Sequence, residues 1–251
     1  MALAVTNRRS QLSAAGFGTG NFTCTAFTPS NSSLLVVFGG FIHQANSGKS
    51  GTDMTIADSL GTLTWTSAIF SGTTTVWGYG CRIWTAPIGT GASMTVTLGT
   101  GGVNAENYVI NAMDFTGYNT STPTGATASG KDADGNGAGN ITLSGSPASD
   151  SIILAGVSVV MNSGTNTVSP GTGWNEIYDT AETDWVGYET EYLTSPSSTS
   201  VDWVDLSVTG NPAEALMIAV EIKAAAGGAT RPVKMAGPWN GYAGESGGFA
   251  G

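Results

Sequence analysis

The sequence predicts an all-β protein: an antiparallel two-sheet sandwich of jelly-roll type, followed by an extended, non-globular C-terminal tail. Short runs rich in Val, Ile, Thr and aromatic residues recur along the chain, separated by Gly, Pro, Ser and Asn. No segment keeps the helical period of about 3.6 residues for three turns. Glycine is abundant, with 37 of 251 residues, and only 10% of residues are charged, a composition that favours strands and turns over helices.

The first half of the chain contains the clearest central strand. Residues Leu34–Ile42 (LLVVFGGFI) are nearly all apolar, which predicts a strand buried on both faces. Residues Thr74–Thr85 place Tyr79 and Cys81 on one face and Arg82 on the other, and Pro87 follows where the strand should end. The other strands expected here are Asn21–Thr28, Met54–Ala57, Leu63–Phe70, Ser93–Leu98 and Tyr108–Phe115.

The second half repeats this style after a long polar stretch, residues 116–140, for which we expect no strand. The strands expected after it are Ile141–Leu143, Ser151–Val160, Thr183–Tyr192, Val201–Val208 and Ala215–Ile222. We therefore divide the chain into an N-terminal arm or first edge strand (1–20), a β-sandwich domain (21–223) and a Gly/Ala-rich tail (224–251).

The tail has a composition of its own. Gly and Ala dominate it, and such a segment cannot bury enough apolar surface by itself to offset its ordering entropy. It carries isolated basic, apolar and aromatic residues of the kind that dock into pockets on a partner, although a plain linker is the alternative interpretation. The expected partner-contact residues of the tail are Arg231, Pro232, Lys234, Met235, Trp239, Tyr242 and Phe249.

The net charge of −10 argues against sequence-independent nucleic-acid binding, which needs cations to neutralise phosphates, and against docking on an anionic membrane. No apolar run of about 18 residues predicts a membrane span. The N-terminus lacks the apolar core of a signal peptide, so we expect the protein to be made in a cytoplasm. Cys24 and Cys81 fall on different predicted strands; two free thiols are the favoured expectation and a disulfide is the alternative.

Acidic and aromatic residues cluster between residues 174 and 192. Trp174, Trp185 and Tyr188 could stack on sugars, and neighbouring carboxylates could form the acid pair that glycosidases use. However, Glu189 and Glu191 alternate with other residues along one strand, the pattern of a solvated face. We therefore expect glycan contact more than catalysis here.

Asp132, Asp134 and Asn136 resemble the first half of a Ca²⁺ loop, but Leu143 stands where a bidentate glutamate is needed. This leaves a weak candidate Ca²⁺ site, with an ordinary polar turn as the alternative. The chain has one histidine, His43, and no G-x-S-x-G nucleophile motif. We expect no catalytic residues, no cofactor beyond that candidate Ca²⁺, and no enzymatic activity.

Several short motifs resemble those of a loosely defined family of phage and prophage β-sandwich (jelly-roll) proteins, some of which are virion proteins. The similarity covers residues 32–223, and its motifs are SSLLVVFGGF, SLGTLTWTSA, WTAPIGTGASMTVTLG, YVINAMDFTGY, GTGWNEIYDT and ALMIAVEIK. The resemblance implies a jelly-roll fold and a role in a virus particle, and it carries no catalytic residues.

These expectations together favour a non-enzymatic bacteriophage virion protein, a capsid decoration (cement) or tail-associated subunit. Its expected partners are major capsid or tail proteins and copies of itself, and its expected location is the virion. Eight of the eighteen acidic residues lie between Glu176 and Asp205, while four of the eight basic residues lie near the termini, a distribution that suits head-to-tail contact between copies. A glycan-binding module of a phage particle is the alternative, and a glycoside hydrolase comes third.

Overall fold

The computed structural model consists of β-strands joined by turns and loops. It describes residues 2–13, 20–43, 50–73, 78–100, 105, 107–132, 139–161, 165–180, 186–203, 205–209 and 212–226. In this part of the chain the one helix is a short 3₁₀ turn, Gly51–Asp53, and no helix is long and apolar enough to cross a membrane. The strands pair antiparallel throughout the described ladders. The all-β, antiparallel prediction is therefore confirmed.

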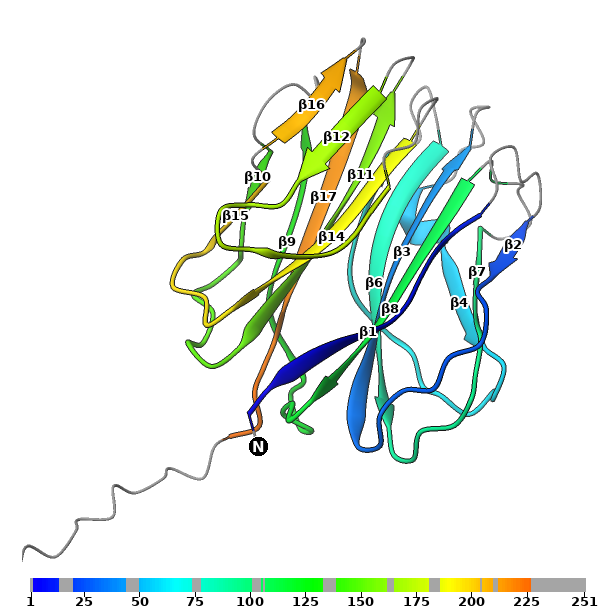
Figure 1. Cartoon of the computed structure of the whole chain (residues 1–251), viewed down its shortest axis with the longest axis vertical. Helices are drawn as coiled ribbons and strands as arrows, with labels where there is room; N and C mark the ends of the chain where they lie inside the picture. The colour runs from blue at the N-terminus through cyan, green and yellow to red at the C-terminus, as the bar shows by residue number, and fades with distance from the viewer. Residues whose placement is uncertain are drawn as a thin grey trace, which may run out of the picture.

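Two five-stranded sheets pack face to face and form the centre of the molecule (Figure 1). The strands of the N-terminal sheet, in spatial order, are β1 (Ala4–Leu12), β8 (Asn107–Thr116), β3 (Ser33–His43), β6 (Gly78–Ile88) and β5 (Thr66–Thr73). The strands of the C-terminal sheet, in spatial order, are β13 (Asn175–Thr180), β14 (Val186–Thr194), β11 (Ile152–Met161), β17 (Pro212–Ile222) and β9 (Thr124–Asp132).

Shorter strands cover the outer face of each large sheet, which produces the four layers seen in Figure 1. The N-terminal sheet is covered by β2 (Asn21–Thr23), β7 (Val96–Gly99) and β4 (Thr55–Asp58). The C-terminal sheet is covered by two pairs, β10 (Asn140–Thr142) with β15 (Ser200–Asp202), and β12 (Thr165–Ser169) with β16 (Asp205–Thr209). The sequence predicts the two-sheet sandwich but not these additional layers.

Three apolar cores separate the four layers. The central core contains Phe38, Leu154 and Ile218, from both large sheets. The outer cores are built around Trp84 in the N-terminal half and Trp203 in the C-terminal half. Burial of apolar surface stabilises a fold by roughly 25 cal/mol per Å². The layers are therefore held together mainly by these cores.

Strand β3 shows why a continuous apolar run was needed. Leu34, Val36 and Phe38 face the central core, whereas Leu35 and Val37 face the outer core of the N-terminal half. Because successive side chains of a strand point to opposite faces, a strand between two cores must be apolar at every position. The prediction of a central strand at Leu34–Ile42 is confirmed.

The two large sheets approach so closely that glycine is required at their contact. A Cβ atom added to Gly156 on β11 would lie 2.4 Å from Cε2 of Phe38, and one added to Gly40 on β3 would lie 2.5 Å from Cε1 of Tyr188. Real Cβ atoms do not approach other atoms so closely. These glycines let the aromatic rings of the opposing sheet rest on the backbone.

The C-terminal half (124–222) repeats the topology of the N-terminal half (4–116). The large sheet of the N-terminal half has the order β1-β8-β3-β6-β5, and the large sheet of the C-terminal half has the order β9-β17-β11-β14-β13. The strands at the same place in these two orders correspond to each other: β1 to β9, β8 to β17, β3 to β11, β6 to β14 and β5 to β13. The outer strands also correspond: β2, β7 and β4 match β10, β15–β16 and β12. The chain is therefore a tandem duplication of one β unit whose copies pack through their large sheets.

One stretch of sequence retains this duplication. When Tyr79 is aligned with Tyr188, residues 78–87, which lie in β6, and residues 187–196, which begin in β14, share one pattern. The pattern is Gly-Tyr, five residues, Thr, one residue, Pro. Both tyrosines are buried in the central core.

A hydrogen bond also links the two large sheets: Nδ2 of Asn111 on β8 donates to Oγ1 of Thr190 on β14 at 2.9 Å.

Some strands differ from the predictions. The stretch 116–140 contains β9, which the sequence analysis missed because TGATASGKD has no apolar alternation. Strands β12 and β13 were also missed, and the expected strand Asn21–Thr28 is reduced to Asn21–Thr23 followed by a bridge at Phe27. Cys24 and Cys81 are both buried and free, as the favoured expectation had it.

Candidate functional site

Four carboxyl groups share one face of β13 and β14 in the C-terminal half. Glu176 lies directly opposite Glu191 across the ladder, and Asp179 lies directly opposite Glu189. Like charges at directly opposed positions destabilise a sheet. Because no Lys, Arg or His occurs between Lys131 and Lys223 in the sequence, neighbouring segments of this half supply no counter-charge.

The two glutamates of β14 are completely buried, whereas Glu176 and Asp179 are exposed. One carboxylate oxygen of Glu191 accepts a hydrogen bond from the backbone N–H of Gly171 at 2.9 Å. Among the described residues, neither oxygen of Glu189 has a hydrogen-bond partner. The prediction that Glu189 and Glu191 form a solvated face is therefore wrong. Strands β12 and β16 add an outer layer to the C-terminal half, and an isolated alternation pattern cannot reveal that layer.

Burial changes the ionisation of this cluster. Burial, reinforced by the charges of Glu191 and Asp179, raises the pKa of Glu189 to about 9. Burial also raises the pKa of Glu191 to about 8, against the opposing effect of the Gly171 hydrogen bond. Both groups are thus neutral acids at pH 7, and the pKa of Asp179 is raised by partial burial and by Glu176.

The matching position in the N-terminal half has the opposite chemistry. Because Tyr79 corresponds to Tyr188, Arg82, three residues later, corresponds to Glu191. Phe70 lies opposite Arg82 on the neighbouring strand, and Glu176 lies opposite Glu191, so Phe70 corresponds to Glu176. The Arg82 guanidinium lies 5.6 Å from the centre of the Phe70 ring and 5.3 Å from the Trp84 ring. Its Nε donates to Oγ of Ser67 at 2.8 Å. A cation on aromatic rings thus replaces the carboxyl pair.

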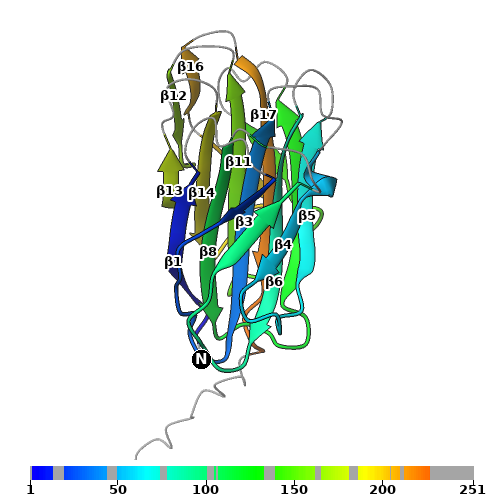
Figure 2. The same ribbon diagram turned by 90° about the vertical axis from the view of Figure 1, so that its right-hand side faces the viewer.

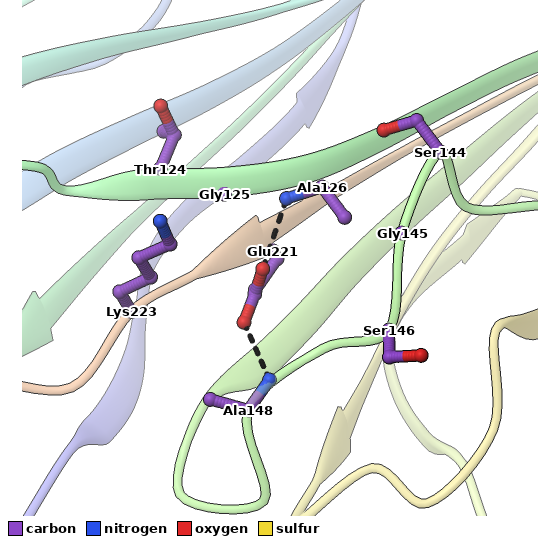
Figure 3. A pocket seen from close by; sticks show the side chains of 9 residues that line it. All are labelled: Thr124, Gly125, Ala126, Ser144, Gly145, Ser146, Ala148, Glu221 and Lys223. Carbon is purple, nitrogen blue, oxygen red and sulfur yellow. Dashed lines mark hydrogen bonds between the residues drawn. The ribbon is translucent and has the colours of Figure 1, made fainter.

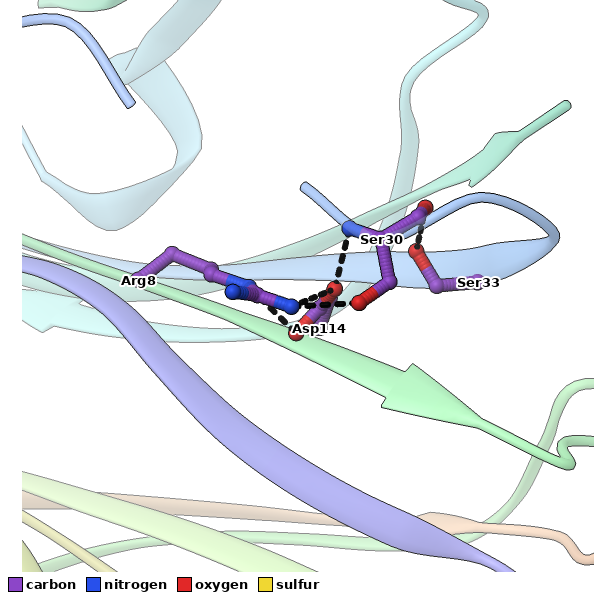
Figure 4. A network of polar contacts seen from close by, with 4 residues as sticks. All are labelled: Arg8, Ser30, Ser33 and Asp114. Atoms are coloured by element: carbon purple, nitrogen blue, oxygen red, sulfur yellow. Dashed lines mark hydrogen bonds and ion pairs between the residues drawn. The ribbon is translucent and has the colours of Figure 1, made fainter. Parts of the chain in front are cut away.

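Each half also contains one buried carboxylate near the end of its last strand. In the N-terminal half this is Asp114 of β8, which forms a two-pronged ion pair with Arg8: Nε to Oδ1 is 2.8 Å and Nη2 to Oδ2 is 3.0 Å (Figure 4). Asp114 also accepts the backbone N–H of Ser30 at 2.5 Å, and Oγ of Ser33 donates to the Ser30 carbonyl at 2.8 Å. Asp114 therefore ties β1 and the loop before β3 to β8.

In the C-terminal half the same position is Glu221 of β17. Its carboxylate accepts the backbone N–H groups of Ala126 at 2.9 Å and Ala148 at 2.8 Å (Figure 3). Oγ of Ser151 donates to the Ala148 carbonyl at 2.7 Å, as Ser33 does to Ser30. A shallow pocket of about 530 Å³ opens beside Glu221 between β9 and the loop at residues 144–148, with Lys223 at its wall.

The expected glycan-contact residues do not form a common surface. Tyr188 is completely buried in the central core, so its assignment to glycan contact is wrong: the residue is part of the packing between the two sheets. Trp174 is partly exposed and packs against the outer core of the C-terminal half. Trp185 lies outside the described residues. Glu189 and Glu191 have no exposed surface that a substrate could reach.

Other expected site residues lie at or beyond the limits of the described chain. Asp132 ends β9, but Asp134 and Asn136 lie outside the described residues, so the structure does not test the Ca²⁺ loop. All seven expected contact residues of the tail lie outside them as well. In the part that is described, no three His, Cys, Asp or Glu side chains are placed to hold a metal ion.

Comparison with known proteins gives no significant match to a protein-family model, to a curated protein or to a solved structure.

Proposed function

We propose that the protein is a non-enzymatic structural component of a bacteriophage particle, a capsid decoration (cement) or tail-associated subunit that contacts copies of itself and a major capsid or tail protein. The observation that carries this proposal is the strand order, which occurs twice in the chain. It supports a jelly-roll unit, an architecture common in viral capsid proteins.

The support for a jelly roll comes from the pairing of each strand. In a jelly roll the first, eighth, third and sixth strands form one sheet, and β1-β8-β3-β6 has this order. The second, seventh and fourth strands form part of the other sheet, as do β2, β7 and β4. Each half departs from the pattern in its fifth strand, β5 or β13, which joins the large sheet instead.

The packing also suits a structural role. The central core joins the two units with apolar side chains from both large sheets, and the buried carboxylates Asp114 and Glu221 fasten loops to the last strand of each unit. A subunit held by three cores and these ties presents a rigid surface. A rigid surface loses less conformational entropy when it binds a neighbour.

The alternatives receive less support from the side chains. A hydrolase using Glu189 and Glu191 would need a substrate to reach groups that are completely buried. For a glycan-binding module, Trp174 is the one expected aromatic contact that is both described and partly exposed, because Tyr188 is in the central core.

The proposal is tested by purifying particles on a density gradient from cells that encode the chain, and in parallel from cells in which its gene carries an early stop codon. Quantitative mass spectrometry should find the chain in the intact particles at a fixed ratio to a major capsid or tail protein, and particles from the stop-codon strain should lack it. Recovery of the chain in the soluble fraction alone, with particles of unchanged composition and stability, would overturn the proposal.

A further inference from the structure

Two edge strands at matched positions carry complementary side chains. Strand β5 ends the N-terminal sheet and β13 ends the C-terminal sheet, and each pairs with a single neighbour among the described strands. Figure 2 shows β5 and β13 on opposite sides of the molecule. A surface at β5 and a surface at β13 can therefore engage two different neighbours at once.

The surface at β5 combines an exposed apolar side chain with a cation. Phe70 is 43% exposed, and Leu60 is the other large apolar side chain of comparable exposure in the described chain. Arg82 packs against the Phe70 ring and uses Nε and Nη1 for bonds to Ser67, Thr52 and Met54. In the described residues no group accepts a hydrogen bond from its Nη2, which leaves two N–H donors for a carboxylate. We name Phe70 and Arg82 the basic–aromatic patch.

The surface at β13 is acidic. Glu176 and Asp179 are exposed at the edge, and Glu191 and Glu189 lie directly behind them on β14. We name Glu176 and Asp179 the acidic patch. A guanidinium brought to this patch would form charge-assisted hydrogen bonds with the exposed carboxylates of Glu176 and Asp179.

From these placements we propose that copies of this chain associate head to tail, with the basic–aromatic patch of one copy on the acidic patch of the next. The occupant of each patch is thus a second copy of the chain. The two patches lie on opposite sides of each copy, so a pair of copies still has one free acidic patch and one free basic–aromatic patch. Further copies can bind to these, and the association continues as an open series or closes as a ring.

The charges also exclude competing contacts. An acidic edge repels a second acidic edge, and an arginine edge repels a second arginine edge, so the symmetric pairings β13–β13 and β5–β5 are disfavoured. The two units share one fold, so their edge strands β5 and β13 have similar shapes. The opposite charges on these two edges therefore favour contact between β5 of one copy and β13 of another. The inference deepens the proposed function, since a particle subunit that contacts copies of itself needs such surfaces, but its test requires no particle.

The test is sedimentation velocity of the purified full chain over a concentration series, at low and high salt. The wild type should form species larger than a dimer as concentration rises, and salt should weaken them. The variants Phe70→Thr and Glu176→Lys should each raise the dissociation constant at least about tenfold, which is the effect expected from the loss of one good contact. Leu60→Thr is the matched control and should leave association unchanged.

Mixing the two variants tests the head-to-tail geometry. Phe70→Thr keeps an intact acidic patch and Glu176→Lys keeps an intact basic–aromatic patch, so the mixture should form a one-to-one complex that does not grow. Both substituted residues are exposed, and near-ultraviolet circular dichroism verifies that the variants are folded.

The inference is overturned if the wild type stays monomeric at all concentrations, if it stops at a closed dimer, or if Leu60→Thr weakens association as much as Phe70→Thr. The two proposals fail separately. A chain that associates through these patches but is missing from particles contradicts the proposed function alone. A chain found in particles whose patch variants associate like the wild type contradicts the interface alone.

Discussion

Asp114 and Glu221 occupy the same position in the two halves of the molecule. Asp114 precedes Phe115, which pairs with Leu34 at the start of β3, and Glu221 precedes Ile222, which pairs with Ile152 at the start of β11. Asp114 accepts the backbone N–H of Ser30, and the Ser33 hydroxyl donates to the Ser30 carbonyl. In the same way, Glu221 accepts the backbone N–H of Ala148, and the Ser151 hydroxyl donates to the Ala148 carbonyl. The duplication thus extends to individual hydrogen bonds.

Replacement of Asp114 by Asn should lower the free energy of unfolding by about 3 kcal/mol, because it leaves the partly buried Arg8 without its charged partner and weakens the bond from Ser30. Urea denaturation measures the loss. The exposed Asp150 provides the control, and Asp150→Asn should cost less than about 0.5 kcal/mol. Equal effects of the two substitutions would show that the Asp114 ion pair does not stabilise the fold.

The buried carboxyl groups predict that the protein loses stability as the pH rises. The pKa of Glu189 is about 9 in the folded protein and 4.5 in the unfolded reference, so between these values the folded state binds more protons than the unfolded state. The free energy of unfolding should therefore fall across this window, by up to about 1 kcal/mol per pH unit for this group.

Glu189→Gln should remove this part of the pH dependence, because an amide does not ionise. The variant should resemble the wild type near pH 5 and exceed its melting temperature near pH 9, whereas Asp150→Asn should follow the wild type at both. A Glu189→Gln variant with the same pH profile as the wild type would contradict the burial of this group.

The contact between Gly156 and the Phe38 ring predicts that the two sheets tolerate no side chain there. Gly156→Ala should destabilise the protein by about 1 to 3 kcal/mol, because the added methyl group forces the ring or the sheets to move. Gly145→Ala is the matched control, since a Cβ at that position meets nothing within 4 Å. Chemical denaturation of both variants checks the prediction, and a neutral Gly156→Ala would mean that the sheets lie farther apart.

The two cysteines should be unreactive in the native protein. Cys24 and Cys81 are free and buried, and burial raises the pKa of both thiols, so little thiolate is present and little of it is accessible. Ellman's reagent should label neither thiol under native conditions and both in denaturant. Rapid labelling of a native thiol would contradict the described packing.

The sequence predicted those elements whose pattern reflects their own burial. Strand β3 was recognised because every residue of its apolar run faces one of two cores. Strand β9 was missed because its partner β17 and the backbone tie to Glu221 hold it in place, and its own side chains are small and polar.

The candidate site was less predictable for the same reason. The alternation of Glu189 and Glu191 correctly places them on one face, but which face is buried depends on β12 and β16, which are distant in sequence. The correspondence between Arg82 and Glu191 becomes visible only when strand pairing aligns the two halves. Long-range pairing is the information that a single sequence does not contain.

Electron cryomicroscopy of the gradient-purified particles tests the proposed role most directly. We expect repeated copies of a four-layered β body on the head or tail, with the β5 edge of one copy facing the β13 edge of the next. A reconstruction of complete particles in which no density fits this body would contradict the proposed function.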